Sequence, residues 1–213
     1  SVEGAGISTR TVVPKVTTSV PGVDPQFLVA PDARQRLRSD SPCWIQYAFE
    51  RPFTCRSITV RPEGTSFQPL RLRIEASDDG QALRPITQLE PPRHGWQNGD
   101  ADVTYSLTPV TARTFRFVYD PAGTEPGSED LDSAKWRPSL RVRGIELSSE
   151  PRIHQFEGKT GQVWRVAGRT TARQVPDGLC VPQDRIVDIT EHLDGRGRLQ
   201  WAVPEGTWTI LRM

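Results

Sequence analysis

Apolar residues recur at every second position in two stretches of this chain, 43–49 and 69–77. A period of two sends successive side chains to opposite faces of a strand, whereas a helix would mix Arg71 with Ile74 on one face. Half-buried strands of an antiparallel sheet are therefore expected, with these residues facing the core: Ile45, Tyr47, Phe49, Leu70, Leu72, Ile74 and Ala76.

Further short strands are expected over 55–61, 82–89, 103–108, 113–119 and 139–148. Turn-forming residues separate them, in the triplets Glu50-Arg51-Pro52 and Pro62-Glu63-Gly64, in Asp78-Asp79-Gly80, and at Pro109. About seven short strands with such punctuation predict an all-β fold, an antiparallel sandwich of jelly-roll type or a barrel.

The last of these strands changes phase along its length. Leu140 and Val142 share one face, but Ile145 and Leu147 follow one step out of register across Gly144. A slip of one residue would turn the strand inside out, so a β-bulge is expected at Gly144.

The spacing of apolar residues and turn signals changes after Glu150, and we place a domain boundary near 150, at Pro151. Residues 1–150 are expected to form the sandwich, followed in 151–213 by a small, incomplete β region ending in a Trp-rich hairpin. In that hairpin Trp201 and Trp208 would pair across the turn Pro204-Glu205-Gly206. Because Met213 is the only methionine and the strand-like TWTILRM lacks a polar tail, we interpret both ends as cuts through a larger polypeptide.

Charge and composition exclude several classes of function. The net charge is +1, with no basic cluster unopposed by acids, so no nucleic-acid surface is expected. No apolar run approaches the ~20 residues of a membrane span. The three cysteines, Cys43, Cys55 and Cys180, do not form a disulfide framework and are interpreted as small buried hydrophobes.

Acidic residues do not form a recognisable catalytic pair. Cleaving a glycosidic bond needs two carboxylates ~5 Å or ~6.5–9.5 Å apart across the sugar. Asp78 and Asp79 adjoin Gly80, where turn geometry accounts for them. The groups 129–132 and 184–188 are not fixed by the pattern either, although the former is an alternative cation site. We therefore expect no catalytic residue in this chain, and the scattered His94, His154 and His192 predict no zinc site.

A sugar-binding site needs an aromatic face and polar groups for the hydroxyls. Trp96 has that setting, and Trp136 is a second candidate. The candidate ligands around Trp96 are His94, Gln97, Asn98 and Asp100. The alternative is that each indole packs under its own loop, and Trp44 is expected to pack within the core strand.

The order of these segments resembles a known family. WIQYAFERPFTCRSITV, LRIEASDDGQALRPI, TARTFRFVY and PSLRVRGIELSS resemble the discoidin-like (galactose-binding-like) sandwich. PRIHQFEGKTG and RIVDITEHLDGRGRLQWAVPEGTWTILRM resemble glycoside hydrolase family 106, the bacterial α-L-rhamnosidases. The resemblance covers residues 41–213. It implies an accessory, non-catalytic portion of an enzyme whose separate barrel holds the catalytic acids and calcium.

This resemblance also sets the expected partners. A polysaccharide and the rest of the parent polypeptide are the implied partners, and export from a bacterium is implied with them. The loop in which many discoidin-like domains hold calcium has only Asp32 and Asp40 here, so no cofactor is expected, with calcium as the alternative. The alternatives are a carbohydrate-binding module that acts alone and a structural or protein-interaction sandwich.

Overall fold

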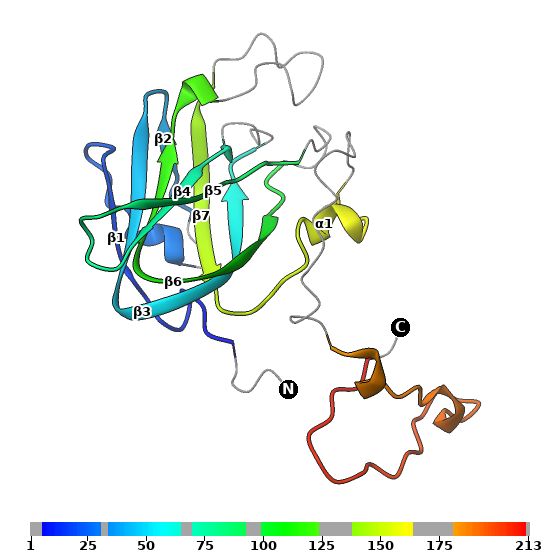
Figure 1. Cartoon of the computed structure of the whole chain (residues 1–213). Coiled ribbons are helices and arrows are strands. Elements are labelled where there is room, and N and C mark those ends of the chain that lie inside the picture. Colours follow the sequence, from blue (N-terminus) through cyan, green and yellow to red (C-terminus); the bar gives the residue numbers. More distant parts are fainter. Residues whose placement is uncertain are drawn as a thin grey trace. The chain divides into compact units, whose positions relative to one another are not determined.

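The computed structural model describes residues 6–30, 34–64, 70–92, 99–123, 138–163 and 181–211 (Figure 1). The chain divides into two compact units, Val2–Val175 and Pro176–Met213. Within the described ranges, no helix is both long and apolar enough to cross a membrane.

The first unit is built from strands. They are β1 (Lys15–Thr18), β2 (Leu37–Ser39), β3 (Cys43–Pro62), β4 (Arg73–Ser77), β5 (Arg84–Gln88), β6 (Val103–Tyr119) and β7 (Leu140–Ser148). Its helices are short, namely α1 (Phe156–Lys159) and 3₁₀ turns at Pro25–Val29 and Pro121–Gly123. The expected all-β, antiparallel fold is confirmed.

Two long strands, β3 and β6, connect the layers of this sandwich. The strand order is β2-β7-β3-β6-β4-β5, with β1 also beside β3, and every pair is antiparallel. The first half of β3 pairs with β1 and the end of β6, whereas its second half pairs with the start of β6 and with β7. Across the core, the Tyr47 hydroxyl donates to the carbonyl oxygen of Ile145 at 2.9 Å.

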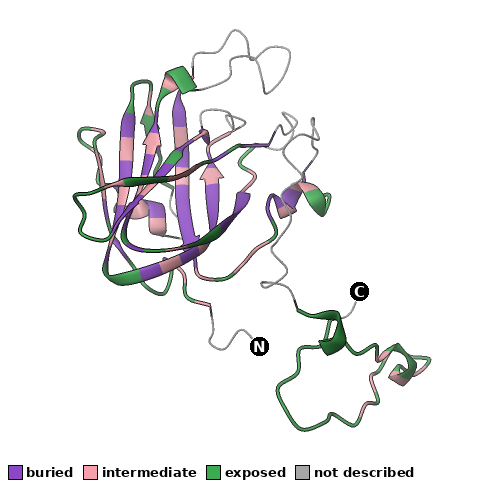
Figure 2. Cartoon of the chain, viewed as in Figure 1, coloured by how far each residue is buried: buried purple, intermediate pink, exposed green. Residues whose placement is uncertain are grey.

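The core follows the alternation in the sequence (Figure 2). Ile45 and Tyr47 of β3 are buried between partly exposed neighbours, and Ile74 of β4 shows the same pattern. Phe49 stacks on Phe53 with ring centroids 4.6 Å apart. Cys43 and Cys55 are buried and free, as expected, and burial raises the pKa of the Cys55 thiol to about 12. Cys180 lies outside the described residues.

The turn expected at Glu50-Arg51-Pro52 is instead an irregularity within one strand. The stretches 43–49 and 55–61 both belong to β3, and the register with β6 shifts between Ala48 and Phe53. Pro52 therefore lies where the ladder is interrupted, and its missing N–H leaves no bond unmade. The stretches 103–108 and 113–119 are likewise both part of β6.

The irregularity expected near Gly144 is confirmed. Arg61 pairs with Gly144 while Pro62 pairs with Val142, so Arg143 is the extra residue on β7. The backbone of Leu28 approaches closely at this point. A Cβ on Gly144 would lie 3.3 Å from the Leu28 carbonyl oxygen, which favours glycine.

Trp44 does not pack in the core, contrary to expectation. It is half-buried and faces away from Ile45, which is buried. The Arg116 guanidinium carbon lies 4.9 Å from the centroid of its ring. Period two places Trp44 on the outer face, and cation–π contact with arginine takes the place of core packing.

Residues 151–163 pack on the sandwich and belong to the compact unit Val2–Val175. The main-chain N–H of Gln155, for example, donates to the Thr104 carbonyl oxygen at 2.6 Å. Whether 151–213 form a separate domain in a longer protein stays a prediction.

Over the described residues 181–211, the second unit has no strands of the expected hairpin. Over 181–211 the structure has 3₁₀ turns at Gln183–Arg185 and Thr190–His192 and an isolated bridge between Leu193 and Leu199. The expected indole pair is present without strands, because Trp201 and Trp208 meet edge to face with centroids 5.2 Å apart. The Trp208 indole N–H donates to the Pro204 carbonyl oxygen at 2.9 Å, which closes the turn through a side chain.

Candidate functional site

Most of the predicted sugar-binding residues lie outside the described part of the chain. These are His94, Trp96, Gln97, Asn98 and Trp136. Their role stays a prediction. Asp100 is the one member of the predicted set within the described ranges.

Asp100 forms hydrogen bonds with two residues that are distant in the sequence, Gly64 and Arg143. Its N–H donates to the Gly64 carbonyl oxygen at 2.9 Å, and its Oδ1 accepts from the Gly64 N–H at 2.7 Å. Arg143 donates to the Asp100 carbonyl oxygen at 3.2 Å and to the Pro62 carbonyl oxygen at 2.9 Å. Asp100 has φ +64°, a left-handed conformation that these contacts maintain. It therefore holds a turn in place, and a role in sugar binding stays a prediction.

Two of the acids considered in the sequence, Asp79 and Asp188, accept hydrogen bonds within turns. Asp79 Oδ1 accepts from the N–H groups of Gln81 and Ala82 at 2.8 and 2.9 Å and from the Ser77 hydroxyl at 2.8 Å. These bonds lower the pKa of Asp79 to about 2. Asp188 accepts from the Thr190 N–H at 2.9 Å, and its pKa is lowered by hydrogen bonds to Thr190. Turn geometry thus accounts for both side chains.

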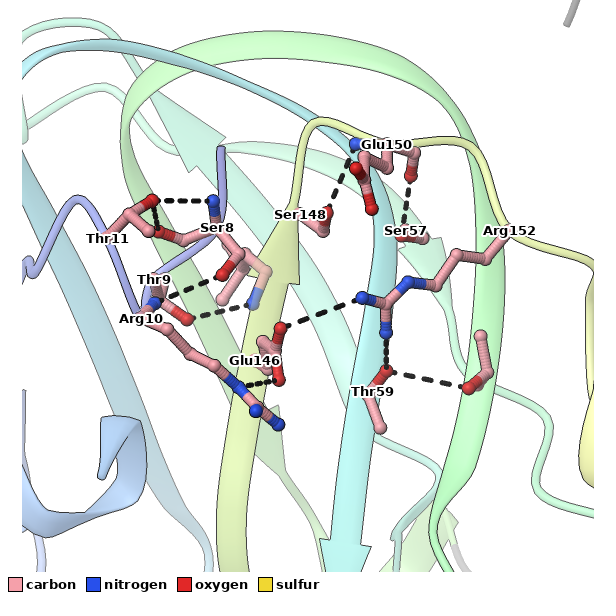
Figure 3. Close-up of polar contacts among 12 residues, drawn as sticks. Ser8, Thr9, Arg10, Thr11, Ser57, Thr59, Glu146, Ser148, Glu150 and Arg152 are labelled. Carbon is pink, nitrogen blue, oxygen red and sulfur yellow. Dashed lines mark hydrogen bonds and ion pairs between the residues drawn. The ribbon is translucent and has the colours of Figure 1, made fainter. Parts of the chain in front are cut away.

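The notable site was not singled out in the sequence and lies on the outward face of β3, β6 and β7 (Figure 3). In the second half of β3, Ser57 to Val60 are all buried, so both faces of the strand are covered. Two segments provide the outer cover, the leading segment (residues 6–11) and the trailing segment (residues 150–157). We call the side chains between them the polar network, which consists of Arg10, Ser57, Thr59, Arg61, Thr104, Glu146, Arg152 and Glu157.

The leading segment runs along the exposed edge of β7. The Thr9 N–H donates to the Leu147 carbonyl oxygen at 3.0 Å, and Ser8 forms a bridge with Ser148. The Ser149 N–H donates to the Ile7 carbonyl oxygen at 2.9 Å. This segment therefore extends the sheet by main-chain pairing and covers the side chain of Glu146.

The trailing segment contains the PRIHQFE sequence and crosses β3 and β6. The Ser57 hydroxyl donates to the Glu150 carbonyl oxygen at 2.8 Å. Arg152 Nη1 donates to Thr59 Oγ1 at 3.2 Å. The Ser106 N–H donates to His154 Nδ1 at 3.3 Å, which leaves the proton of a neutral imidazole on Nε2. The motif residues are thus used to attach the segment to the sheet.

Glu146 is the buried centre of the polar network, with a side chain only 7% exposed. Its Oε2 lies 2.7 Å from Arg10 Nε and 3.3 Å from Arg61 Nη2, and its Oε1 lies 3.8 Å from Arg152 Nη2. Arg61 also contacts Asp102 at 3.3 Å. A buried carboxylate requires such compensation, because desolvation of an unpaired charge is costly.

Glu157 is the second buried carboxylate of the network. It accepts from the Thr104 N–H at 3.1 Å and from the Thr104 hydroxyl at 2.5 Å. Burial raises the pKa of Glu157 above its usual value, and the hydrogen bonds from Thr104 act in the opposite direction. Asp102 nearby raises it further.

This arrangement is suited to attachment rather than to bond cleavage. The carboxylates of Glu146 and Glu157 are already bonded to arginine or threonine donors from other segments. Across the described ranges, no group of three or more His, Cys, Asp or Glu side chains could hold a metal ion. One sequence signal could have indicated the site: Glu146 occupies the strand GIELSS, where a charged residue follows the phase change at Gly144.

Comparisons with known proteins relate this chain to enzymes that act on carbohydrates. A family model described as alpha-L-rhamnosidase, glycoside hydrolase family 106, matches residues 17–213. A putative beta-glucuronidase of Formosa agariphila is 35% identical over 54 residues, which cover 22% of this chain and 5% of that protein.

Two solved structures are similar to this chain. Truncated AlyQ, with CBM32 and alginate lyase domains, is 16% identical with a TM-score of 0.50, covering 70% of this chain and 34% of that chain. This likeness shows the fold alone. A rhamnosidase from Novosphingobium sp. PP1Y is 24% identical with a TM-score of 0.49. The match covers 92% of this chain but 17% of that chain, so the present chain spans only a small part of that rhamnosidase, as it does of the beta-glucuronidase.

Proposed function

The chain belongs to glycoside hydrolase family 106, and from this premise we propose that it is an accessory β-sandwich region of an enzyme that cleaves α-L-rhamnosyl bonds. In this role it supports or orients a catalytic barrel that lies outside residues 1–213. The substrate would be a plant or bacterial polysaccharide, and the parent enzyme would be exported from a bacterium.

The attachment of the trailing segment is the observation that carries this proposal. The segment includes the family-like sequence PRIHQFE, and its Arg152 and His154 side chains are bonded to the sheet. Glu157, the acid of that sequence, is bonded to Thr104. A saturated, buried carboxylate is a poor general acid or nucleophile, since catalysis requires access to the substrate.

The second unit supports the proposal that the rest of the parent polypeptide is a partner. Apolar side chains are exposed throughout 181–211, where burial would be expected in a self-contained domain. They include Val181, Ile186, Val187, Leu193, Val203, Trp208, Ile210 and Leu211. We propose that this surface is covered by the catalytic part of the enzyme.

An activity assay tests the accessory role. The chain alone should not hydrolyse an aryl α-L-rhamnoside, whereas the full-length parent enzyme should. Turnover by the chain alone that is lost on changing an acid within residues 1–213 would overturn the proposal. Glu157→Gln and Asp79→Asn are the first variants to compare, because one acid is buried and the other is exposed.

A carbohydrate-binding module is the alternative, and the contacts of Asp100 favour it. Asp100, a member of the predicted sugar-binding set, is held in place by hydrogen bonds with Gly64 and Arg143. Titration with rhamnose- or galactose-containing oligosaccharides should then show binding that Trp96→Ala and Trp136→Ala weaken. Absence of binding, or binding unchanged in both variants, favours a purely structural or protein-interaction sandwich.

A further inference from the structure

We propose that Glu146 is a joint: one buried carboxylate that holds the leading and trailing segments against the sandwich together. The chain enters the sandwich through the first segment and leaves it through the second, so the joint would fix both directions. That these directions orient a catalytic region rests on the proposed function. The joint itself is inferred from contacts within the described residues.

The two segments reach Glu146 from opposite sides (Figure 3). Arg10 of the leading segment contacts Oε2 at 2.7 Å, and Arg152 of the trailing segment contacts Oε1 at 3.8 Å. Each arginine thus uses a different oxygen of the same carboxylate. Because the carboxylate carries a single negative charge, both segments depend on the same neutralising group.

The two segments also contact each other directly. A Cβ on Gly6 would lie 1.8 Å from Cγ of Glu150, so the leading segment passes against the Glu150 side chain with no space between them. Next to this contact, the Ile7 N–H donates to Oγ of Ser149, the residue before the trailing segment, at 3.0 Å. Movement of either segment would therefore disturb the packing of the other.

Charge explains why Glu146 would act on both segments at once. Three guanidinium groups surround it, from Arg10, Arg61 and Arg152, and Asp102 is the other acid bonded to this group, through Arg61. Removal of the Glu146 charge leaves like charges close together in a partly buried place, where their repulsion is weakly screened. Arg10 and Arg152 are partly exposed, so both can move into solvent and take their segments with them.

Hydrogen exchange on the full chain tests the joint. In Glu146→Gln, backbone amides of 7–11 and of 152–157 should both exchange faster, by on the order of tenfold or more, because local opening becomes easier. Amides of Tyr47 and Phe117 in the core should keep their protection. The matched control is Glu63→Gln, which removes a carboxylate bonded to Arg38 on the surface and should leave both segments unchanged.

Single arginine variants keep the test decisive if Glu146→Gln does not fold. Arg10→Gln should speed exchange most in the leading segment, and Arg152→Gln most in the trailing segment. The double variant should then reproduce the pattern expected of Glu146→Gln.

Three results would overturn the joint: faster exchange in only one segment of Glu146→Gln, no change in either, or an equal loss of protection throughout the core. None of them bears on the rhamnosidase assay. Failure of the joint and failure of the proposed function are therefore distinguishable.

Discussion

The two units of this chain are stabilised in different ways. The sandwich buries a continuous apolar core, with Tyr47, Phe115 and Phe117 almost fully removed from solvent. The described part of the second unit leaves most of its large apolar side chains exposed, and its ordered contacts are turns such as those of Asp194 with Arg196 and Arg198. The first unit is organised by burial, the second by local hydrogen bonds.

This contrast has a physical consequence. Burial of apolar area is the main favourable term in folding, and about 25 cal/mol is gained per Å² removed from water. Residues 181–211 gain little of it within their own unit, and each hydrogen bond of a surface turn contributes only about 0.5–1.5 kcal/mol. The sandwich should therefore be stable by itself, and the second unit should gain order when its apolar side chains are covered.

The largest expected effect comes from removing a core ring. Phe117→Ala should lower the free energy of unfolding of the sandwich by about 3–5 kcal/mol, because it removes a buried side chain and leaves a cavity. Denaturant unfolding followed by far-UV circular dichroism measures the change. Trp208→Ala is the matched change in the second unit and should alter that transition by less than about 0.5 kcal/mol. Equal losses in the two variants would contradict the contrast.

The next largest effect is expected in the pH dependence of stability, which should differ between the buried Glu157 and an acid at the surface. Because the pKa of Glu157 is raised in the folded state, its carboxyl favours folding most below its unfolded pKa. That contribution is lost as pH rises through the folded pKa. Glu157→Gln should remove this decline, so the stability of the variant relative to the natural chain should increase as pH rises. Thermal unfolding between pH 4 and 8 provides the measurement.

Glu63 provides a control of opposite sign for that experiment. The hydrogen bond from Arg38 lowers the pKa of Glu63, so its contribution is present above the unfolded pKa and is lost as pH falls. Glu63→Gln should therefore lose stability relative to the natural chain near neutral pH and approach it in acid. Parallel curves for the two variants would show that the Glu157 assignment is wrong.

A smaller effect is expected from the indole pair of the second unit. Trp201→Ala should remove an edge-to-face contact worth about 0.5–1.5 kcal/mol and weaken order within 199–208 only. The near-UV circular dichroism of the indoles should fall while the unfolding transition of the sandwich stays in place. A displaced sandwich transition would mean that the two units are energetically coupled.

The smallest effect should come from the exposed turn at Asp79. Since its pKa is lowered to about 2 from 3.8, its contribution to stability is lost as pH falls through that interval. Asp79→Ala should be slightly less stable at neutral pH and should show a shallower decline in acid. Thermal unfolding from pH 5 to pH 2 tests this, with Asp78→Ala as the neighbouring control.

Features governed by local pattern were predictable from the sequence. The alternation at Ile45 and Tyr47 gave the correct buried face, and the phase change at Gly144 located the bulge to within one residue. Asp79 was correctly assigned to a turn. Each of these depends on residues within a few positions of one another, where period and turn chemistry suffice.

Features that depend on distant partners were not predictable. Glu146 is buried because residues 6–11 and 150–157 cover it, and nothing near Glu146 in the sequence signals those partners. The joining of 43–49 and 55–61 into β3 depends on pairing with β6 across Pro52. Trp44 was misplaced because its large apolar ring suggested burial, while its contact with Arg116 lies across strands.

The pairing of β3 has a consequence for the order of events during synthesis. Ile58 pairs with Tyr105 and with Leu147, so its two neighbours in the sheet are made long after it. A sheet dominated by such distant pairings forms slowly, since the intervening chain must first be closed into a loop. The ribosome must therefore release the chain through Ser148 before β3 is flanked on both sides. Until then its apolar residues remain open to chaperones and to other nascent chains.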